Sequence, residues 1–185
     1  MRTNHQAFTL IELLTVIAIV MIIFGYAIPS FADLIGKSKV DANVSRLAQV
    51  IQLSRSVAIT NNTKVTMCPI NEKLSCSSNW SNGYMSFVDS NGNRKFEAGE
   101  ELLFQYFSQE PKSKVSWRAF GHRRSLQWLG TGITNHQNGS FELCYADKQK
   151  LYRAIFITKT GRIRYSKDNN NDGYHENSKG ALITC

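Results

Sequence analysis

Two groups of residues in this sequence have the types and spacing to do chemistry. The first is the tetrapeptide Gly161-Arg162-Ile163-Arg164. In a strand, residues two positions apart project on the same side, so both guanidinium groups would lie together, and Gly161 lets the chain turn tightly just before them. Paired guanidinium groups suit phosphate oxygens. The tetrapeptide therefore predicts contact with a nucleic acid; the alternative is a structural or subunit contact made by the same arginines.

Other basic residues extend this charge along the chain. Lys159 and Lys167 flank the tetrapeptide, and Tyr165 offers a ring for stacking. A basic surface with aromatic side chains is typical of sequence-independent nucleic-acid binding. We place Arg123 and Arg124 in the expected DNA-binding set. They belong to a second cluster, whose aromatic members we expect in the core: Arg118, His122, Arg123 and Arg124 with Trp117, Phe120 and Trp128.

The second group is a single carboxylate, Glu12, near the start of an apolar run from Phe8 to Ile28. This run of about 20 residues is long enough to cross a bilayer as a helix. An ionisable side chain in such a segment is costly and indicates a functional site. If the chain were cut between Ala7 and Phe8, the new α-amine would lie one helical turn from Glu12. The alternative is a plain N-terminal anchor.

The polar leader, residues 1–7, precedes the apolar run, whereas an ordinary secretory signal has its cleavage site after the apolar core. No A-x-A pattern follows Ile28. We therefore expect the apolar segment to be retained and only the leader to be removed.

The net charge of +8 is unevenly distributed over the 185 residues. Residues 1–110 hold nine basic and nine acidic residues, while residues 111–185 hold thirteen basic and five acidic ones. Such asymmetry suggests contact with nucleic acid, an anionic surface or an acidic partner. The alternative is a solvated basic face that maintains solubility.

Four cysteines, all after the apolar run, favour disulfides in an exported domain. Four cysteines allow three pairings. We favour Cys68–Cys76 and Cys144–Cys185, with free thiols as the alternative. No C-x-x-C pair and no metal-like Cys/His spacing occurs, so zinc is not expected.

Two loops have the spacing of calcium ligands, although we favour no metal site. Asp168, Asn170 and Asp172 match the first half of an EF-hand loop, with Lys179 where the bidentate Glu should be. An earlier loop fits five ligand positions but has Arg94 where the turn needs glycine: Asp89, Asn91, Asn93, Glu97 and Glu100. The sequence has no H-E-x-x-H, G-x-S-x-G or phosphate-binding loop, so we expect neither an enzyme nor a cofactor.

After Pro29 an apolar stripe at helical spacing continues to Thr60, and Asn61-Asn62 ends it. We expect one helix from residue 8 to 60, with a membrane or filament-core half (8–28) and an amphipathic half (29–60). Residues 61–185 then form a β-rich domain. The expected strands are Lys64–Cys68, Tyr84–Val88, Leu102–Phe107, Lys114–Phe120, Ser125–Leu129, Phe141–Tyr145, Arg153–Thr158 and Arg162–Tyr165.

The stretch Phe8-Thr9-Leu10-Ile11-Glu12-Leu13-Leu14, with Pro29 after it, resembles the N-terminus of type IV pilins and type II secretion pseudopilins. The later domain resembles the GspH/FimT group of minor pilins and pseudopilins. The residues that carry this second resemblance are Cys68-Pro69, Cys76, Trp80, Gly83, the run Phe87 to Asn93, Gly99-Glu100, Phe141-Glu142-Leu143-Cys144, Ala154-Ile155-Phe156-Ile157 and the Gly161–Arg164 tetrapeptide. The implied fold is α+β and pilin-like, a long N-terminal helix packed on an antiparallel sheet domain.

The resemblance implies roles for the N-terminal residues and for the tetrapeptide. A prepilin peptidase would cleave after Ala7 and methylate Phe8, and Glu12 would pair with the amine of a neighbouring subunit. The family usually has Gly before the cut, where this chain has Ala7. In members of the group that act in natural transformation, G-R-x-R is implicated in binding DNA for uptake.

The expected protein is a minor type IV pilin that helps to initiate or cap a pilus and binds DNA. It would lie in the bacterial inner membrane, with its domain in the periplasm, and assemble with other pilins or pseudopilins. Two alternatives need no DNA: the H-type pseudopilin of a type II secretion system, and a purely structural subunit that primes pili.

Overall fold

The structure is a computed structural model that describes residues 9–122 and 124–185. Ala7 and Phe8, at the expected cleavage, and Arg123, in the expected DNA-binding set, lie outside the described residues. The chain divides into two compact units, residues 1–38 and 39–185. One helix, α1 (Leu10–Thr60), contributes to both units.

In the first unit, α1 begins directly after Thr9, whose hydroxyl accepts a hydrogen bond from the backbone N–H of Glu12 (3.3 Å). This contact is that of a helix N-cap, which satisfies one of the backbone donors left free at a helix start. The apolar part of α1 reaches a mean hydropathy of 2.5 and is long and apolar enough to cross a membrane.

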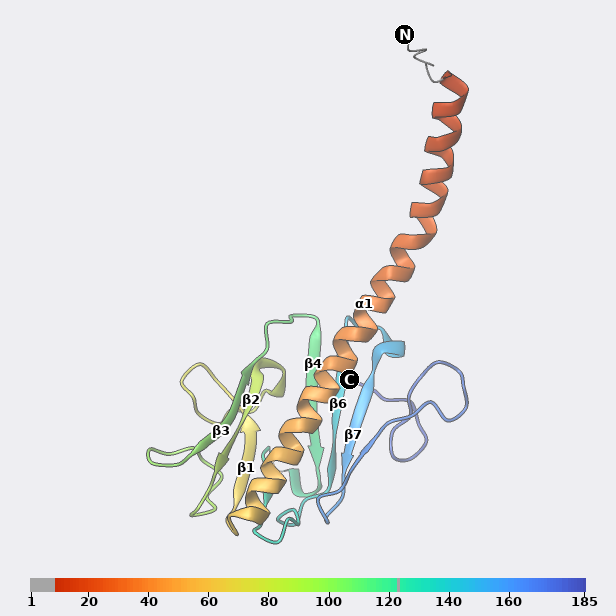
Figure 1. Cartoon of the computed structure of the whole chain (residues 1–185). Helices are drawn as coiled ribbons and strands as arrows, with labels where there is room; N and C mark the ends of the chain where they lie inside the picture. Colours follow the sequence, from red (N-terminus) through yellow and green to blue (C-terminus); the bar gives the residue numbers. More distant parts are fainter. Residues whose placement is uncertain (1–8, 123) are drawn as a thin grey trace. The chain divides into compact units, whose positions relative to one another are not determined.

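In the second unit, the described strands form two four-stranded antiparallel sheets (Figure 1). The first sheet has the order β3-β2-β1-β5, and the second has the order β4-β6-β7-β8. The strands are β1 (Val65–Pro69), β2 (Gly83–Val88), β3 (Leu102–Phe107), β4 (Ser113–Ala119), β5 (Leu126–Trp128), β6 (Gly139–Tyr145), β7 (Arg153–Ile157) and β8 (Ile163–Tyr165).

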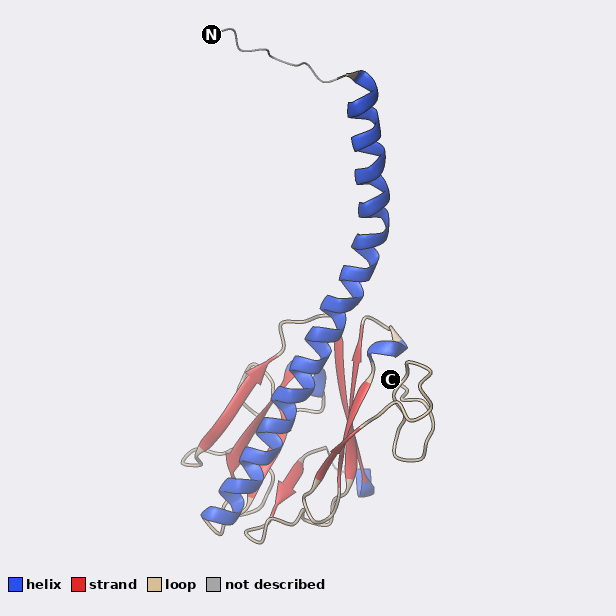
Figure 2. Cartoon of the chain, turned by 45° about the vertical axis from the view of Figure 1, so that its right-hand side comes forward, coloured by secondary structure: helices blue, strands red, loops and turns tan. Residues whose placement is uncertain are grey.

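The part of α1 that belongs to this unit lies against both sheets (Figure 2). Its buried side chains recur at helical spacing, so they form one apolar stripe. They share a core with side chains from both sheets: Leu47, Ala48, Val50, Ile51 and Ala58 of α1, Val65, Met67, Leu126 and Trp128 of the first sheet, and Phe141, Leu143, Ile155 and Ile157 of the second.

The α+β prediction is confirmed, and each expected strand is present, with its ends shifted by at most two residues. The structure pairs Cys68 with Cys76 and Cys144 with Cys185, at Cα–Cα distances of 5.6 and 6.4 Å. The first bond closes a short loop beside β1. The second joins the C-terminus to β6.

Candidate nucleic-acid interface

The turn between β7 and β8 is held in place by Arg55 of α1. The Arg55 Nε donates to the Gly132 carbonyl oxygen (2.9 Å), and its Nη2 donates to the Thr160 carbonyl oxygen (3.3 Å). Gly161 has a φ of +75°, and a Cβ at this position would lie 2.6 Å from the Arg55 Nε. Both the left-handed backbone and the lack of space explain why this position holds glycine. The helix therefore positions the turn that leads into the two arginines.

Arg162 and Arg164 are both exposed. Arg162 ends the turn, where its carbonyl oxygen accepts from the N–H of Thr158 (3.0 Å), and Arg164 lies in the middle of β8. Within residues 9–122 and 124–185, neither guanidinium group has a hydrogen bond or ion pair to another side chain. Lys159 and Lys167, on either side of them, are exposed as well. These four cations are therefore free to meet an anionic ligand.

Tyr165 lies on the opposite face of β8 from Arg164, because side chains alternate along a strand. It pairs with Ile155 of β7, whose side chain is in the core, and it lines a hollow with Asp41 and His175. The stacking partner that the sequence suggested for the arginines is therefore directed to the other side of the sheet.

The arginines of the second basic cluster differ in their contacts. Arg118 of β4 forms an ion pair with Glu142 of β6 (Nε–Oε2 2.9 Å) and donates to the Thr184 carbonyl oxygen (3.2 Å). Burial raises the pKa of the Glu142 carboxyl, and the Arg118 charge partly offsets this. Arg124 is exposed, and with Arg118 it lines a surface hollow of about 550 Å³ beside Trp80 and Trp117.

The aromatic members of this cluster differ in exposure. Trp128 is fully buried in the core, and Trp117 packs on Phe141 with a centroid distance of 4.4 Å. Phe120, in contrast, is 73% exposed. The expectation that these rings are core residues is confirmed for Trp128 and wrong for Phe120, because Phe120 lies two residues after Arg118, on the face of the sheet that points away from the core.

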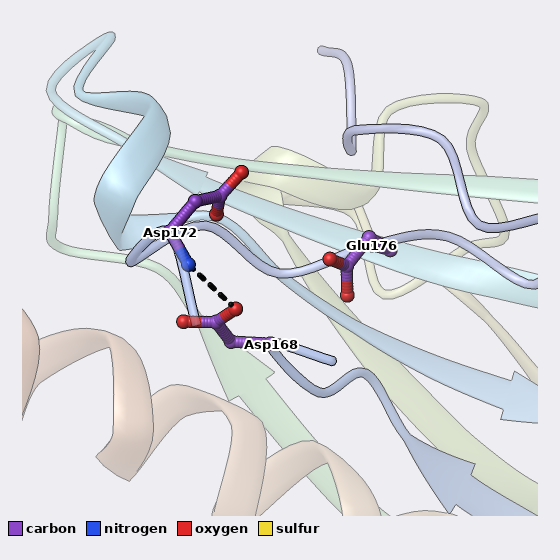
Figure 3. Close-up of side chains that lie close together, drawn as sticks. All are labelled: Asp168, Asp172 and Glu176. Atoms are coloured by element: carbon purple, nitrogen blue, oxygen red, sulfur yellow. Dashed lines mark hydrogen bonds between the residues drawn. The ribbon is translucent and has the colours of Figure 1, made fainter. Parts of the chain in front are cut away.

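The C-terminal loop brings three carboxylates together: Asp168, Asp172 and Glu176 have oxygens within 4.8 Å of one another (Figure 3). The loop supplies its own donors to them. The backbone N–H groups of Asp172 and Gly173 donate to Asp168 (3.2 and 2.8 Å). The third calcium candidate, Asn170, donates to Asp172 (2.9 Å). Glu176 was not singled out in the sequence, although it falls at the ninth position of the loop, where an EF-hand also places a ligand.

In the other candidate calcium loop, which follows β2, Asp89 is a buried hydrogen-bond acceptor. Asp89 is fully buried, and its Oδ2 accepts hydrogen bonds from Thr66 Oγ1 (2.6 Å), Gln127 Nε2 (2.7 Å) and the Arg94 backbone N–H (3.0 Å). This carboxylate thus joins β1, β5 and the loop after β2. Buried charges are tolerated when they are hydrogen-bonded in this way. Its contacts give it a structural role in the first sheet.

His175 holds the C-terminal loop against the second sheet. Its Nδ1 is 3.0 Å from Ser166 Oγ, which also accepts a hydrogen bond from the Ala154 backbone N–H (2.9 Å). Burial lowers the pKa of His175, and the nearby Arg153 charge lowers it further. The neutral ring is therefore the form that the folded loop favours.

Comparison with known proteins identifies the family of this chain. The model of the family described as type II transport protein GspH matches residues 43–161, which is more than half of the chain. The chain belongs to the GspH family. The prokaryotic N-terminal methylation motif also matches this GspH-family chain, at residues 2–28.

Two relatives are consistent with this assignment. Pilin-like protein PilA1 of Thermus thermophilus is 31% identical over 112 residues, which span 60% of this chain and 66% of that protein. The type IV minor pilin FimU of Pseudomonas aeruginosa has the same fold, with a TM-score of 0.56 at 17% identity over 70% of this chain and 90% of FimU. The chain is thus a minor pilin or pseudopilin of GspH type, a structural subunit and not an enzyme.

Proposed function

We propose that this protein is a minor type IV pilin whose Arg162–Arg164 surface binds DNA for uptake. It would be anchored in the inner membrane with its domain in the periplasm, cleaved after Ala7 and methylated at Phe8 by a prepilin peptidase. It would then enter a pilus through Glu12 and help to initiate or cap the filament. The family membership and the methylation motif support the assembly part of the proposal.

The single observation that carries the DNA part is an exposed, unpaired arginine pair in a region without acidic neighbours in the sequence. No Asp or Glu occurs between Lys148 and Lys167, or between Pro111 and Phe141. These segments contain β4, β7 and β8 of the second sheet, so the strands on both sides of the β7–β8 turn lack acidic residues. The remaining strand, β6, carries Glu142, which is buried and paired with Arg118. Phosphate contacts of this kind supply most sequence-independent affinity for DNA.

The test is duplex DNA binding by the full-length protein in detergent micelles, over a range of salt concentrations. Each lost phosphate contact lowers the slope of log affinity against log salt by about 0.9, so Arg162→Ala/Arg164→Ala should lower it by about 1.8. Between 50 and 200 mM salt, the ratio of wild-type to variant DNA affinity should therefore fall roughly tenfold. Lys73→Ala/Lys95→Ala is the control, since both lysines are exposed and belong to loops of the first sheet.

An unchanged affinity and slope in the double arginine variant would refute the DNA proposal. The H-type pseudopilin of a type II secretion system, which needs no DNA, would then become the leading function. The family description as a type II transport protein favours that second candidate.

A further inference from the structure

The register of the second sheet places four side chains in one row across its outer face. Arg118 of β4 pairs with Ser140 of β6, Ser140 pairs with Phe156 of β7, and Phe156 pairs with Arg164 of β8. Directly paired residues of antiparallel strands project on the same face. The neighbouring residues Phe141 and Ile155 are in the core, so this row faces away from it.

The ladder continues one step beyond the named strands at both edges. The Phe120 N–H donates to the Asn138 carbonyl oxygen (3.0 Å), and the Thr158 N–H donates to the Arg162 carbonyl oxygen (3.0 Å). A second row therefore lies beside the first on the same face and consists of Phe120, Asn138, Thr158 and Arg162. We call the eight residues of both rows the outer platform: Arg118, Phe120, Asn138, Ser140, Phe156, Thr158, Arg162 and Arg164.

The outer platform has cations at both edges and aromatic rings between and beside them. Its width is three strand spacings, or about 14 Å. Phe120 is 73% exposed, the largest exposure of any large apolar side chain described in residues 39–185, and Phe156 is partly exposed. No platform residue is acidic. The adjacent row holds Glu142, but this carboxylate is buried and paired with Arg118.

The C-terminal segment bounds the outer platform on one side. Cys185 is bonded to Cys144 of β6, and the Thr184 carbonyl oxygen accepts from Arg118. The segment therefore covers the part of the outer face that contains Cys144 and Glu142. The rows of Ser140 and Asn138 remain partly or fully exposed.

A sheet face with exposed aromatics and a basic rim suits unpaired bases. Single-stranded nucleic acids bind proteins through stacking of bases on aromatic rings and through cations that contact the backbone. A duplex hides the faces of its bases, so it can use the arginines but not the rings. Resting on the proposed function, we propose that the outer platform binds DNA segments with unpaired bases, and that Phe120 is a stacking residue.

The test uses the full-length protein in detergent micelles with two labelled probes, a single-stranded oligo-dT and a blunt duplex of the same length. Phe120→Ala should weaken oligo-dT binding at least about fivefold, because stacking of one base contributes that much or more. Duplex affinity should stay within about twofold. The control is Phe107→Ala, which removes a ring that is 40% exposed at the end of β3 in the first sheet.

A second variant tests the centre of the outer platform without removing a ring. Ser140→Glu places a carboxylate between Arg118 and Arg164 and should weaken oligo-dT binding. Gln105→Glu makes the same charge change at an exposed position of β3 and should not. Unaltered circular dichroism of each variant would show that the fold is retained.

The outcomes separate this inference from the proposed function. If Phe120→Ala and Ser140→Glu bind oligo-dT like the wild type while the arginine pair still matters for duplex DNA, the outer-platform inference is wrong and the proposed function stands. If the wild type binds neither probe, both are wrong. If Phe120→Ala blocks entry into filaments but leaves oligo-dT binding intact, the ring contacts another subunit and the inference is again overturned.

Discussion

Replacing Gly161 with alanine should destabilise the domain more than the same replacement at Gly180. Both glycines have positive φ, +75° and +80°. This conformation costs a residue with a Cβ about 1–2 kcal/mol. At Gly180 the new Cβ would meet no atom within 4 Å, so this backbone cost is the whole expected effect. At Gly161 it would collide with the Gly132 carbonyl oxygen and lie 2.6 Å from the Arg55 Nε.

The collision at Gly161 cannot be relieved by a side-chain rotation alone, because the Gly132 oxygen belongs to the backbone. A shift of the turn would weaken the Arg55 hydrogen bonds to Gly132 (2.9 Å) and Thr160 (3.3 Å). A net hydrogen bond contributes about 1 kcal/mol. We therefore expect Gly161→Ala to cost about 2–4 kcal/mol, against about 1–2 for Gly180→Ala.

The assay is urea denaturation of the full-length variants in identical micelles, followed by tryptophan fluorescence. All three tryptophans, Trp80, Trp117 and Trp128, lie in residues 39–185, so the signal reports on this unit. The midpoint should fall further for Gly161→Ala, with an unchanged dependence on denaturant. Equal midpoints for the two variants would refute the steric argument and, with it, the view that Arg55 and Gly132 hold the turn.

Three further predictions concern other parts of the chain. Glu12→Leu should still insert into membranes but fail to enter filaments, as measured by pilus fractionation; normal entry would contradict the amine pairing. Because the pKa of His175 is lowered in the folded state, the unfolded chain binds the proton more readily, and stability should fall as the pH drops below about 6.5. His175→Asn should reduce that fall in urea midpoints between pH 7.5 and 5, and an identical fall would exclude it as the cause. Removing the Cys144–Cys185 bond should cost about 4 kcal/mol, and removing Cys68–Cys76 about 2.5, because the bonds close loops of 41 and 8 residues; a reversed order in melting experiments would contradict this dependence on loop length.

Several elements could be predicted because their signals are local. The apolar stripe of α1 repeats at helical spacing, and Asn61-Asn62 follows its last residue. Short β-rich runs marked each strand, and Gly and Asn clusters separated several of them, although β5 and β8 are only three residues long. The Glu12 motif and the Gly161–Arg164 tetrapeptide were also visible, because their chemistry depends on residues close together in the chain.

Other predictions could not be decided from local patterns. The ligand-like spacing of the loop after β2 concealed the role of Asp89, which accepts hydrogen bonds from Thr66 and Gln127, residues 23 and 38 positions away. Tyr165 adjoins Arg164 in the sequence but faces the other side of the sheet. Phe120 lies in a cluster of aromatics whose other members are buried or partly buried, yet it is exposed.

The sequence by itself determined the class of the protein: an apolar N-terminal helix with one carboxylate, an amphipathic continuation, a β-rich domain with four cysteines, and a basic C-terminal half. Only the tertiary structure decided which cations share a surface. Arg118 and Arg164 meet on one face because β4, β6, β7 and β8 pair in a particular register. Arg55 reaches Thr160, 105 residues away, because α1 packs on the sheets. Side-chain alternation follows from local geometry and can be read from the sequence. Strand pairing and helix docking depend instead on how the whole core is buried, and they decide which side chains share one surface.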